Sequence, residues 1–152
     1  KMQMLEEQDL DSILYAVDDI QPTIVIIDSL NTVCVEDYIQ GSATAMRIAA
    51  REIYKFTQSH GIGLFLVVQM DKTGTNYAGP KEVEHIVDTS LLLHFEGNKK
   101  NKIRRLDCDT KNRFGPTPST QRFKMVEEGL IEIDEEAEAE PEIDPPTLRS
   151  VP

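Results

Sequence analysis

Two spacings of hydrophobic residues alternate along the first part of the chain. Over residues 10–20 they recur at intervals of three and four, which predicts an amphipathic helix that Pro22 ends. A second helix of this kind is predicted over residues 43–59, with Ser42 as its N-cap and Gly61 just past its end. A short helical segment is predicted at residues 81–88.

Continuous apolar runs separate these helices. TIVIIDSL (23–30), IGLFLVVQM (62–70) and TSLLLHFEG (89–97) predict three strands, and the first two are typical of parallel strands buried on both faces. After residue 101 the strands carry charged faces, in 102–114 and 121–133, and Glu128-Gly129 marks a hairpin turn. The order predicts an α/β fold, a mostly parallel sheet flanked by helices with a C-terminal antiparallel meander.

Charge is unevenly distributed along the 152 residues, whose formal net charge is -11. Residues 134–152 hold seven of the 27 acidic side chains and one basic one, which predicts an acidic, disordered tail after a single domain at 1–133. Five cations crowd into residues 99–105. The overall negative charge therefore does not exclude a nucleic-acid partner at this basic segment.

The lengths of the apolar runs and the positions of the cysteines indicate whether the protein binds a membrane and in which compartment it lies. No apolar run approaches the roughly 20 residues that span a bilayer, so we expect no membrane partner. Cys34 and Cys108 are isolated, without the spacing of a zinc site or a disulfide framework. We interpret both as reduced cysteines in a cytoplasmic protein.

Polar side chains end the first two predicted strands. Asp28 follows four aliphatic residues, and a carboxylate at the end of a parallel strand can hold the water shell of Mg²⁺ beside a nucleotide, with Ser29 as a neighbouring hydrogen-bonding group. Gln69 is placed to bond a terminal phosphate and couple it to the glycine-rich loop that follows. The alternatives are a turn-capping aspartate and a strand-end glutamine without a role.

Two cations stand two residues apart in DTKNRFGPT (109–117). If this stretch ends a strand, Lys111 and Arg113 project to the same side and can share an anion. The alternative is a pair of cations that protects an exposed edge strand from aggregation.

IVIIDSLNT, GIGLFLVVQMDKTG, YAGPKEVEHIVDTSLLL and KNRFGPT follow one another in this chain in an order and spacing that resemble the bacterial RadA (Sms) family of RecA-type ATPases. The resemblance covers residues 10–133 and implies part of a RecA-like P-loop NTPase core. It also implies ATP-dependent DNA repair and recombination with branch migration. KNRFG resembles the family's signature, and together with the AGP…EH.VDT block it is far more specific than any single Walker motif.

The resemblance implies a role for each nucleotide-site residue. Asp28 would be the Walker B carboxylate that holds Mg²⁺ through water, beside Ser29. Gln69 stands at the sensor position, where the family is expected to have His and where RecA or DnaB-type helicases have Gln. Lys111 and Arg113 would reach the ATP of a neighbouring subunit, and Arg113 would act as an arginine finger.

The resemblance also implies single-stranded DNA as a partner. Residues 71–81 resemble the second DNA-binding loop, which makes Lys72, Thr73 and Lys81 candidate phosphate contacts, and residues 35–42 resemble the first. Lys111 would alternate between nucleotide and DNA. The implied assembly is a homo-oligomeric ring, expected to be a hexamer, with a RecA-type recombinase as a further partner.

No GxxxxGK[ST] phosphate loop occurs in the 152 residues. We therefore expect this chain to be part of a longer motor, which binds ATP and Mg²⁺ when complete, and not to hydrolyse ATP alone. Two alternatives stay open: a non-catalytic RadA-like module that binds DNA or a partner ATPase, and a DnaB-like replicative helicase core.

Overall fold

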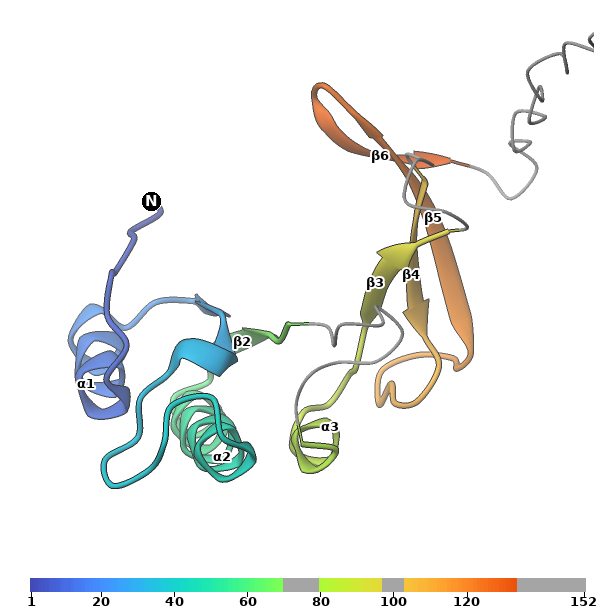
Figure 1. The fold of residues 1–152 in the computed structure, drawn as a ribbon. Helices are drawn as coiled ribbons and strands as arrows, with labels where there is room; N and C mark the ends of the chain where they lie inside the picture. The colour runs from blue at the N-terminus through green and yellow to red at the C-terminus, as the bar shows by residue number, and fades with distance from the viewer. Residues whose placement is uncertain (70–79, 97–102, 134–152) are drawn as a thin grey trace, which may run out of the picture.

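The part of the chain that the structure describes forms two β-sheets and three α-helices (Figure 1). The computed structural model describes residues 1–69, 80–96 and 103–133. In chain order the elements are α1 (Leu10–Ile20), β1 (Ile24–Asp28), the 3-10 helix η1 (Leu30–Thr32), α2 (Ala43–Ser59), β2 (Gly63–Val67), α3 (Glu82–Ile86), β3 (Leu92–Phe95), β4 (Ile103–Cys108), β5 (Ser119–Val126) and β6 (Gly129–Ile133).

The two long helices begin at side-chain caps. Asp9 accepts a hydrogen bond from the backbone N–H of Ser12 at 2.9 Å, and Ser42 accepts one from the N–H of Ala45 at 3.2 Å. Each cap satisfies a backbone donor that has no partner within its helix. Gly61 follows α2 with φ +66°, the left-handed conformation expected just beyond a helix. Both predicted helices are confirmed within one residue of the expected bounds.

One hydrophobic core lies between α1, η1, α2, α3 and one face of the parallel pair β1–β2. Leu30, Ile53 and Thr57 are its largest fully buried side chains. The opposite face of β1–β2 is open, and Ile24, Ile26 and Phe65 are 54%, 66% and 57% exposed there. The expectation of burial on both faces thus holds for one face, because the described helices cover only that side.

The second sheet is an antiparallel meander in the order β3-β4-β5-β6. β3, which the sequence placed with the parallel strands, pairs with β4 from Leu92 opposite Asp107 to Phe95 opposite Arg104. Gly129 turns the β5–β6 hairpin at φ +126°, a conformation that favours glycine. The α/β class and the C-terminal meander are confirmed, while the described parallel sheet is limited to two strands.

Within the described residues no helix is long and apolar enough to cross a membrane.

Candidate functional site

Asp28 and Gln69 lie at the same end of the parallel pair. Asp28 is the last residue of β1 and sits opposite Val67 of β2, and Gln69 follows two residues later. Both are exposed, whereas Ser29 is only 7% exposed beneath them. The structure therefore brings the two predicted strand-end residues to one edge, with Asp28 open to solvent and its neighbour Ser29 in the interior.

Asn31 joins these two strand ends, and sequence reasoning missed it. Its Oδ1 accepts a hydrogen bond from the backbone N–H of Gln69 at 3.0 Å. The η1 turn that carries Asn31 is closed by Thr32, whose N–H and Oγ1 donate to the Ser29 carbonyl at 3.0 and 2.8 Å. Asn31 after the strand-end Asp indicates a turn, but its bond to Gln69, 38 residues later, has no local sequence signal.

The KNRFG segment lies in a turn after β4, not at the end of a strand as expected. Lys111 nevertheless reaches back to α3, where its Nζ donates to the carbonyls of Glu84 and His85 at 3.1 and 2.9 Å. These carbonyls belong to the last turn of a helix and lack partners within it. Lys111 is thus a cap on the C-terminal end of α3.

Arg113 also faces the segment after α3. Its Nη1 lies 2.6 Å from Oδ1 of Asp88, and its backbone N–H donates to the Asp88 carbonyl at 3.1 Å. The OH of Tyr54 on α2 lies 3.5 and 3.4 Å from the two Asp88 carboxylate oxygens. Lys111 and Arg113 therefore project to the same side, as expected, and their contacts there are with this chain's own residues.

Asn112 organises the turn between the two cations. Its Oδ1 accepts hydrogen bonds from the Phe114 N–H at 3.1 Å and from Thr89 Oγ1 at 3.3 Å. Phe114 itself is 83% exposed. A Cβ at Gly115 would lie 2.9 Å from Asn112 Nδ2, closer than Cβ atoms approach other heavy atoms. A larger residue at this position would therefore have to push aside the Asn112 amide, which is held by its hydrogen bonds to Thr89 and Phe114.

We expect Gly115→Ala to lower the free energy of unfolding by about 1 kcal/mol, because the added methyl must displace Asn112 from its hydrogen bonds. Urea unfolding measures the change. The matched control is Gly63→Ala, where the added Cβ would meet its nearest atom, in the Ile24 side chain, at 3.4 Å. Equal stability of the two variants would contradict this account of the turn.

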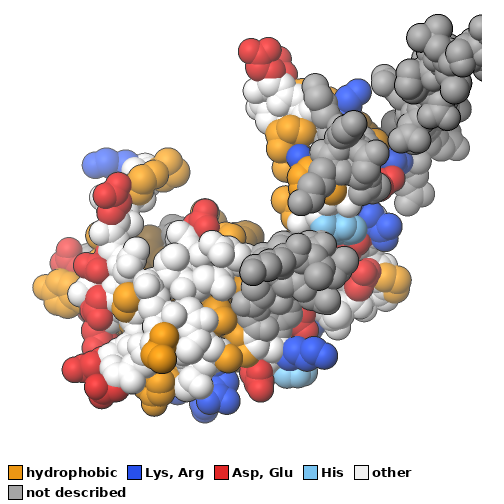
Figure 2. Space-filling view, in the orientation of Figure 1, with side chains coloured by type: hydrophobic (Ala, Val, Ile, Leu, Met, Phe, Trp, Pro, Cys, Tyr) orange, Lys and Arg blue, Asp and Glu red, His pale blue; other side chains and the backbone are white. Residues whose placement is uncertain are grey.

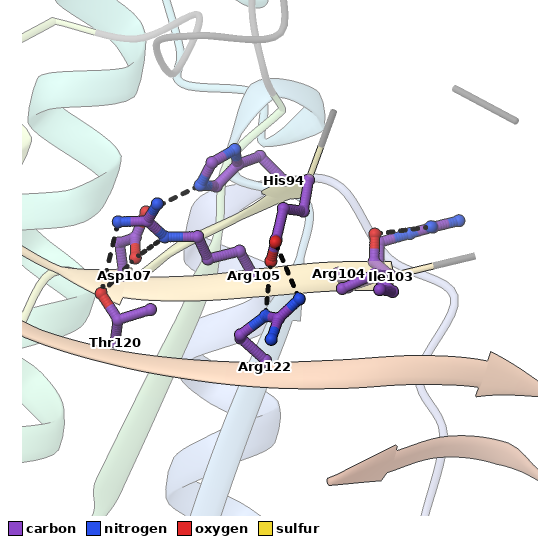
Figure 3. Close-up of polar contacts among 8 residues, drawn as sticks. His94, Ile103, Arg104, Arg105, Asp107, Thr120 and Arg122 are labelled. Atoms are coloured by element: carbon purple, nitrogen blue, oxygen red, sulfur yellow. Dashed lines mark hydrogen bonds and ion pairs between the residues drawn. The ribbon is translucent and has the colours of Figure 1, made fainter. Parts of the chain in front are cut away.

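A buried polar cluster on the antiparallel sheet was also missed. Asp107 is 5% exposed and accepts hydrogen bonds from Arg105 Nε, Thr120 Oγ1 and His94 Nε2, each at 2.7 Å (Figure 3). Burial raises the pKa of the Asp107 carboxyl, but the hydrogen bonds from Thr120, His94 and Arg105 outweigh it and leave the pKa below its ordinary value. Nearby, Arg122 donates to both oxygens of Glu96 at 2.8 and 2.9 Å.

A hollow of about 400 Å³ opens between α2 and α3. Figure 2 shows Lys and Arg side chains along the lower edge of the molecule in this region. The lining residues are Arg47, Arg51, Tyr54, Lys55, Glu82 and Ile86. Lys55 is paired with Glu52 at 3.1 Å, and Glu82 adds a further negative charge. These acids offset much of the positive charge, so the hollow is weakly basic.

The remaining predicted DNA contacts fall in two places. Lys72 and Thr73 lie outside the described residues, while Lys81 is exposed immediately before α3. In the 35–42 loop, Gln40 Nε2 donates to the Thr32 carbonyl at 2.6 Å, and Tyr38 and Ile39 are 48% and 83% exposed.

Asp28 and Gln69 make no hydrogen bond or ion pair with Lys111 or Arg113, so the described part of the site consists of separate groups.

Comparison with curated proteins shows which family the chain resembles. It is 37% identical over 134 residues to the DNA repair protein RadA of Bacillus subtilis, covering 87% of this chain and 28% of that protein. It is 36% identical over 129 residues to RadA of Streptococcus pneumoniae, covering 84% of this chain and 30% of that protein. The chain belongs to the RadA family. It spans less than a third of the length of these RadA relatives, and no family model matches it.

A solved structure supports the fold. A DnaB-like replicative helicase, studied with its primase interactions, superposes with a TM-score of 0.59 at 14% identity, covering 79% of this chain and 33% of that one. This likeness shows the fold alone, a partial RecA-like core. RadA membership and the RecA-like fold, both expected from the motifs, are confirmed.

The residues of this RadA-family chain suit Mg²⁺ better than they suit the phosphates of ATP. Asp28 is an exposed carboxylate at a strand end, which suits the outer water shell of Mg²⁺. The backbone cradle and lysine that hold the β- and γ-phosphates are not encoded in these 152 residues. The residues present could orient the metal side of a nucleotide, and its phosphates need donors from elsewhere.

Proposed function

We propose that this chain is the C-terminal part of the ATPase core of a RadA-type DNA repair protein. In the complete protein it would bind single-stranded DNA and use ATP hydrolysis to promote recombination and branch migration. The observation that carries the proposal is the 37% identity to a DNA repair protein over 87% of the chain. Residues 1–133 would form the core portion, and residues 134–152 an acidic tail.

The nucleotide end of the proposed site rests on Asp28, Ser29 and Gln69. Asp28 would hold Mg²⁺ through water, and Gln69 would sense the terminal phosphate while Asn31 fixes its backbone at 3.0 Å. The phosphate loop would come from another part of the complete protein. The open face of β1–β2, with Ile26 66% exposed, supports a further segment packing there, because apolar patches of this kind mark interfaces.

The DNA side rests on the two loops. Lys81, with Lys72 and Thr73, would contact phosphates, and the half-exposed Tyr38 offers a ring on which a base can stack. Arg113 would reach the nucleotide of a neighbouring subunit in a homo-oligomeric ring, which we propose is a hexamer. Lys111 would stay bound to the carbonyls at the end of α3 and support Arg113 by fixing the turn that carries both residues. A RecA-type recombinase is the further partner we propose.

The DnaB-like structural neighbour favours a second candidate function, that of a replicative helicase core. Gln69 suits it, whereas the KNRFG motif and the named relatives favour RadA. A non-catalytic RadA-like module that regulates a complete motor is the third candidate. It would share the DNA-binding residues and lack the effect of Arg113 on ATP hydrolysis.

The direct test is the affinity of the chain for single-stranded DNA as a function of salt. We expect affinity to fall steeply with salt, because phosphate contacts release counterions, and Lys81→Gln to reduce the log–log slope by about one. Lys72→Gln should do the same. Lys124→Gln, an exposed lysine on β5, is the matched control and should leave the slope unchanged. Affinity that does not depend on salt would overturn the proposed DNA contact.

A further inference from the structure

The two cations of KNRFG are held by unlike partners. Lys111 donates to two backbone carbonyls at the end of α3, and among the described residues no other side chain donates to them. Its removal would leave helix-end carbonyls without this cap. Lys111 is therefore a fixed part of the turn.

Arg113, in contrast, is held by one side-chain contact at a partly exposed position. Its side chain is 55% exposed, and Nη1 is its only guanidinium atom with a partner in the described part of the chain, at 2.6 Å from Asp88. A guanidinium has five N–H donors, so most of them remain available to an anion. Half-exposed ion pairs contribute little net free energy and exchange readily.

Asp88 keeps a partner of its own when Arg113 leaves. The OH of Tyr54 lies 3.4 Å from Asp88 Oδ2, and Gln58 Nε2 donates to that OH at 2.7 Å. The Asp88 carboxylate, with its side chain 27% exposed, is thus supported from α2 independently of Arg113. Moreover, the backbone bond from Arg113 N–H to the Asp88 carbonyl, 3.1 Å long, would hold the turn while the guanidinium moves.

We propose that the Asp88 carboxylate competes with a phosphate anion for binding to the Arg113 guanidinium. In the unbound chain the Asp88 carboxylate occupies the guanidinium, and a polyphosphate anion must displace it. This inference rests on the proposed function, in which Arg113 reaches a nucleotide phosphate. Removing the Asp88 charge should therefore strengthen anion binding, because the competent, free state of Arg113 becomes more populated. A residue that only positioned Arg113 would have the opposite effect.

The test is calorimetric titration of the chain with inorganic tripolyphosphate. Asp88→Asn, which keeps the size of the side chain, should bind roughly two- to fivefold more tightly than the unaltered chain, the range expected for losing a half-exposed ion pair. Glu84→Gln is the matched control, since it removes a nearby acid, whereas the ion pair of Arg113 in the described residues is with Asp88. The gain should be absent there.

A double variant isolates the pair. In Arg113→Gln the further change Asp88→Asn should bring no gain, because the competed-for guanidinium is gone. Equal or weaker binding by Asp88→Asn, a gain that persists without Arg113, or no tripolyphosphate binding by any variant would each overturn the inference. Failure of the proposed function has a separate signature: normal DNA-stimulated ATP hydrolysis by Arg113→Ala in the full-length protein, whatever the tripolyphosphate result.

Discussion

Arg113→Ala in the full-length protein should lower DNA-stimulated ATP hydrolysis by roughly 10³-fold, the lower end of what an arginine finger supplied in trans contributes. The Arg113 side chain is 55% exposed, and within the described residues its guanidinium contacts only Asp88, so we expect it to be available to a neighbour's phosphate. Nucleotide binding by the monomer should survive, because Arg113 would act on the neighbour's site. Steady-state hydrolysis with and without single-stranded DNA measures the first effect, and equilibrium nucleotide titration the second.

Mixed assemblies decide whether Arg113 acts in trans. Subunits with Asp28→Asn lack the carboxylate proposed to hold Mg²⁺ but keep Arg113, and subunits with Arg113→Ala have the reverse defect. Mixing the two should restore part of the hydrolysis that neither shows alone, since some interfaces then combine both intact groups. Arg113→Lys should rescue poorly, because an ammonium lacks the planar fork of donors. Unchanged hydrolysis by Arg113→Ala would remove the in-trans role, and Lys124→Ala serves as the surface control.

The helices were predictable because their signals are local. The three-and-four spacing lies within each helix, and Ser42, the predicted N-cap, directly precedes its helix as Asp9 precedes α1. The pairing of β3 was not predictable, since an apolar run fits a parallel or an antiparallel neighbour equally well, and only the tertiary structure selects β4. The open face of β1–β2 had the same cause: β-branched residues indicate a strand but not what covers it.

The candidate site divides along the same line. Asp28 and Gln69 could be placed together because parallel strands end at one edge. The acceptors of Lys111 are backbone carbonyls about 26 positions earlier in the chain, which carry no sequence signal. Asp107 lay in a strand with charged residues that suggested a solvated face, yet its carboxylate is buried among donors from three strands. These contacts depend on the register between the strands, which the pattern of residue types does not predict.

Asp107→Asn should lower the free energy of unfolding at neutral pH by about 2–3 kcal/mol, because the amide removes the negative charge that Arg105 pairs with and replaces one accepting oxygen by a donor in a buried position. The loss is smaller than that of a fully buried ion pair, because the Arg105 side chain is 43% exposed and water can reach it. Urea unfolding at pH 7 measures the loss. Asp109→Asn, an exposed acid two residues further on, is the matched control and should change stability by less than about 0.5 kcal/mol.

The pH dependence separates this charge effect from a packing defect. The folded pKa of Asp107 is lowered, so the unfolded chain binds the proton more tightly and the stabilisation by this carboxylate is present above the unfolded value, roughly 3.9. It is lost as the pH falls through the folded pKa, since the carboxyl of the unaltered chain is then protonated too. The gap between the unaltered chain and Asp107→Asn should therefore narrow below about pH 4. A gap that stays constant down to pH 3 would mean that the shape of the side chain, rather than its charge, holds the three strands together.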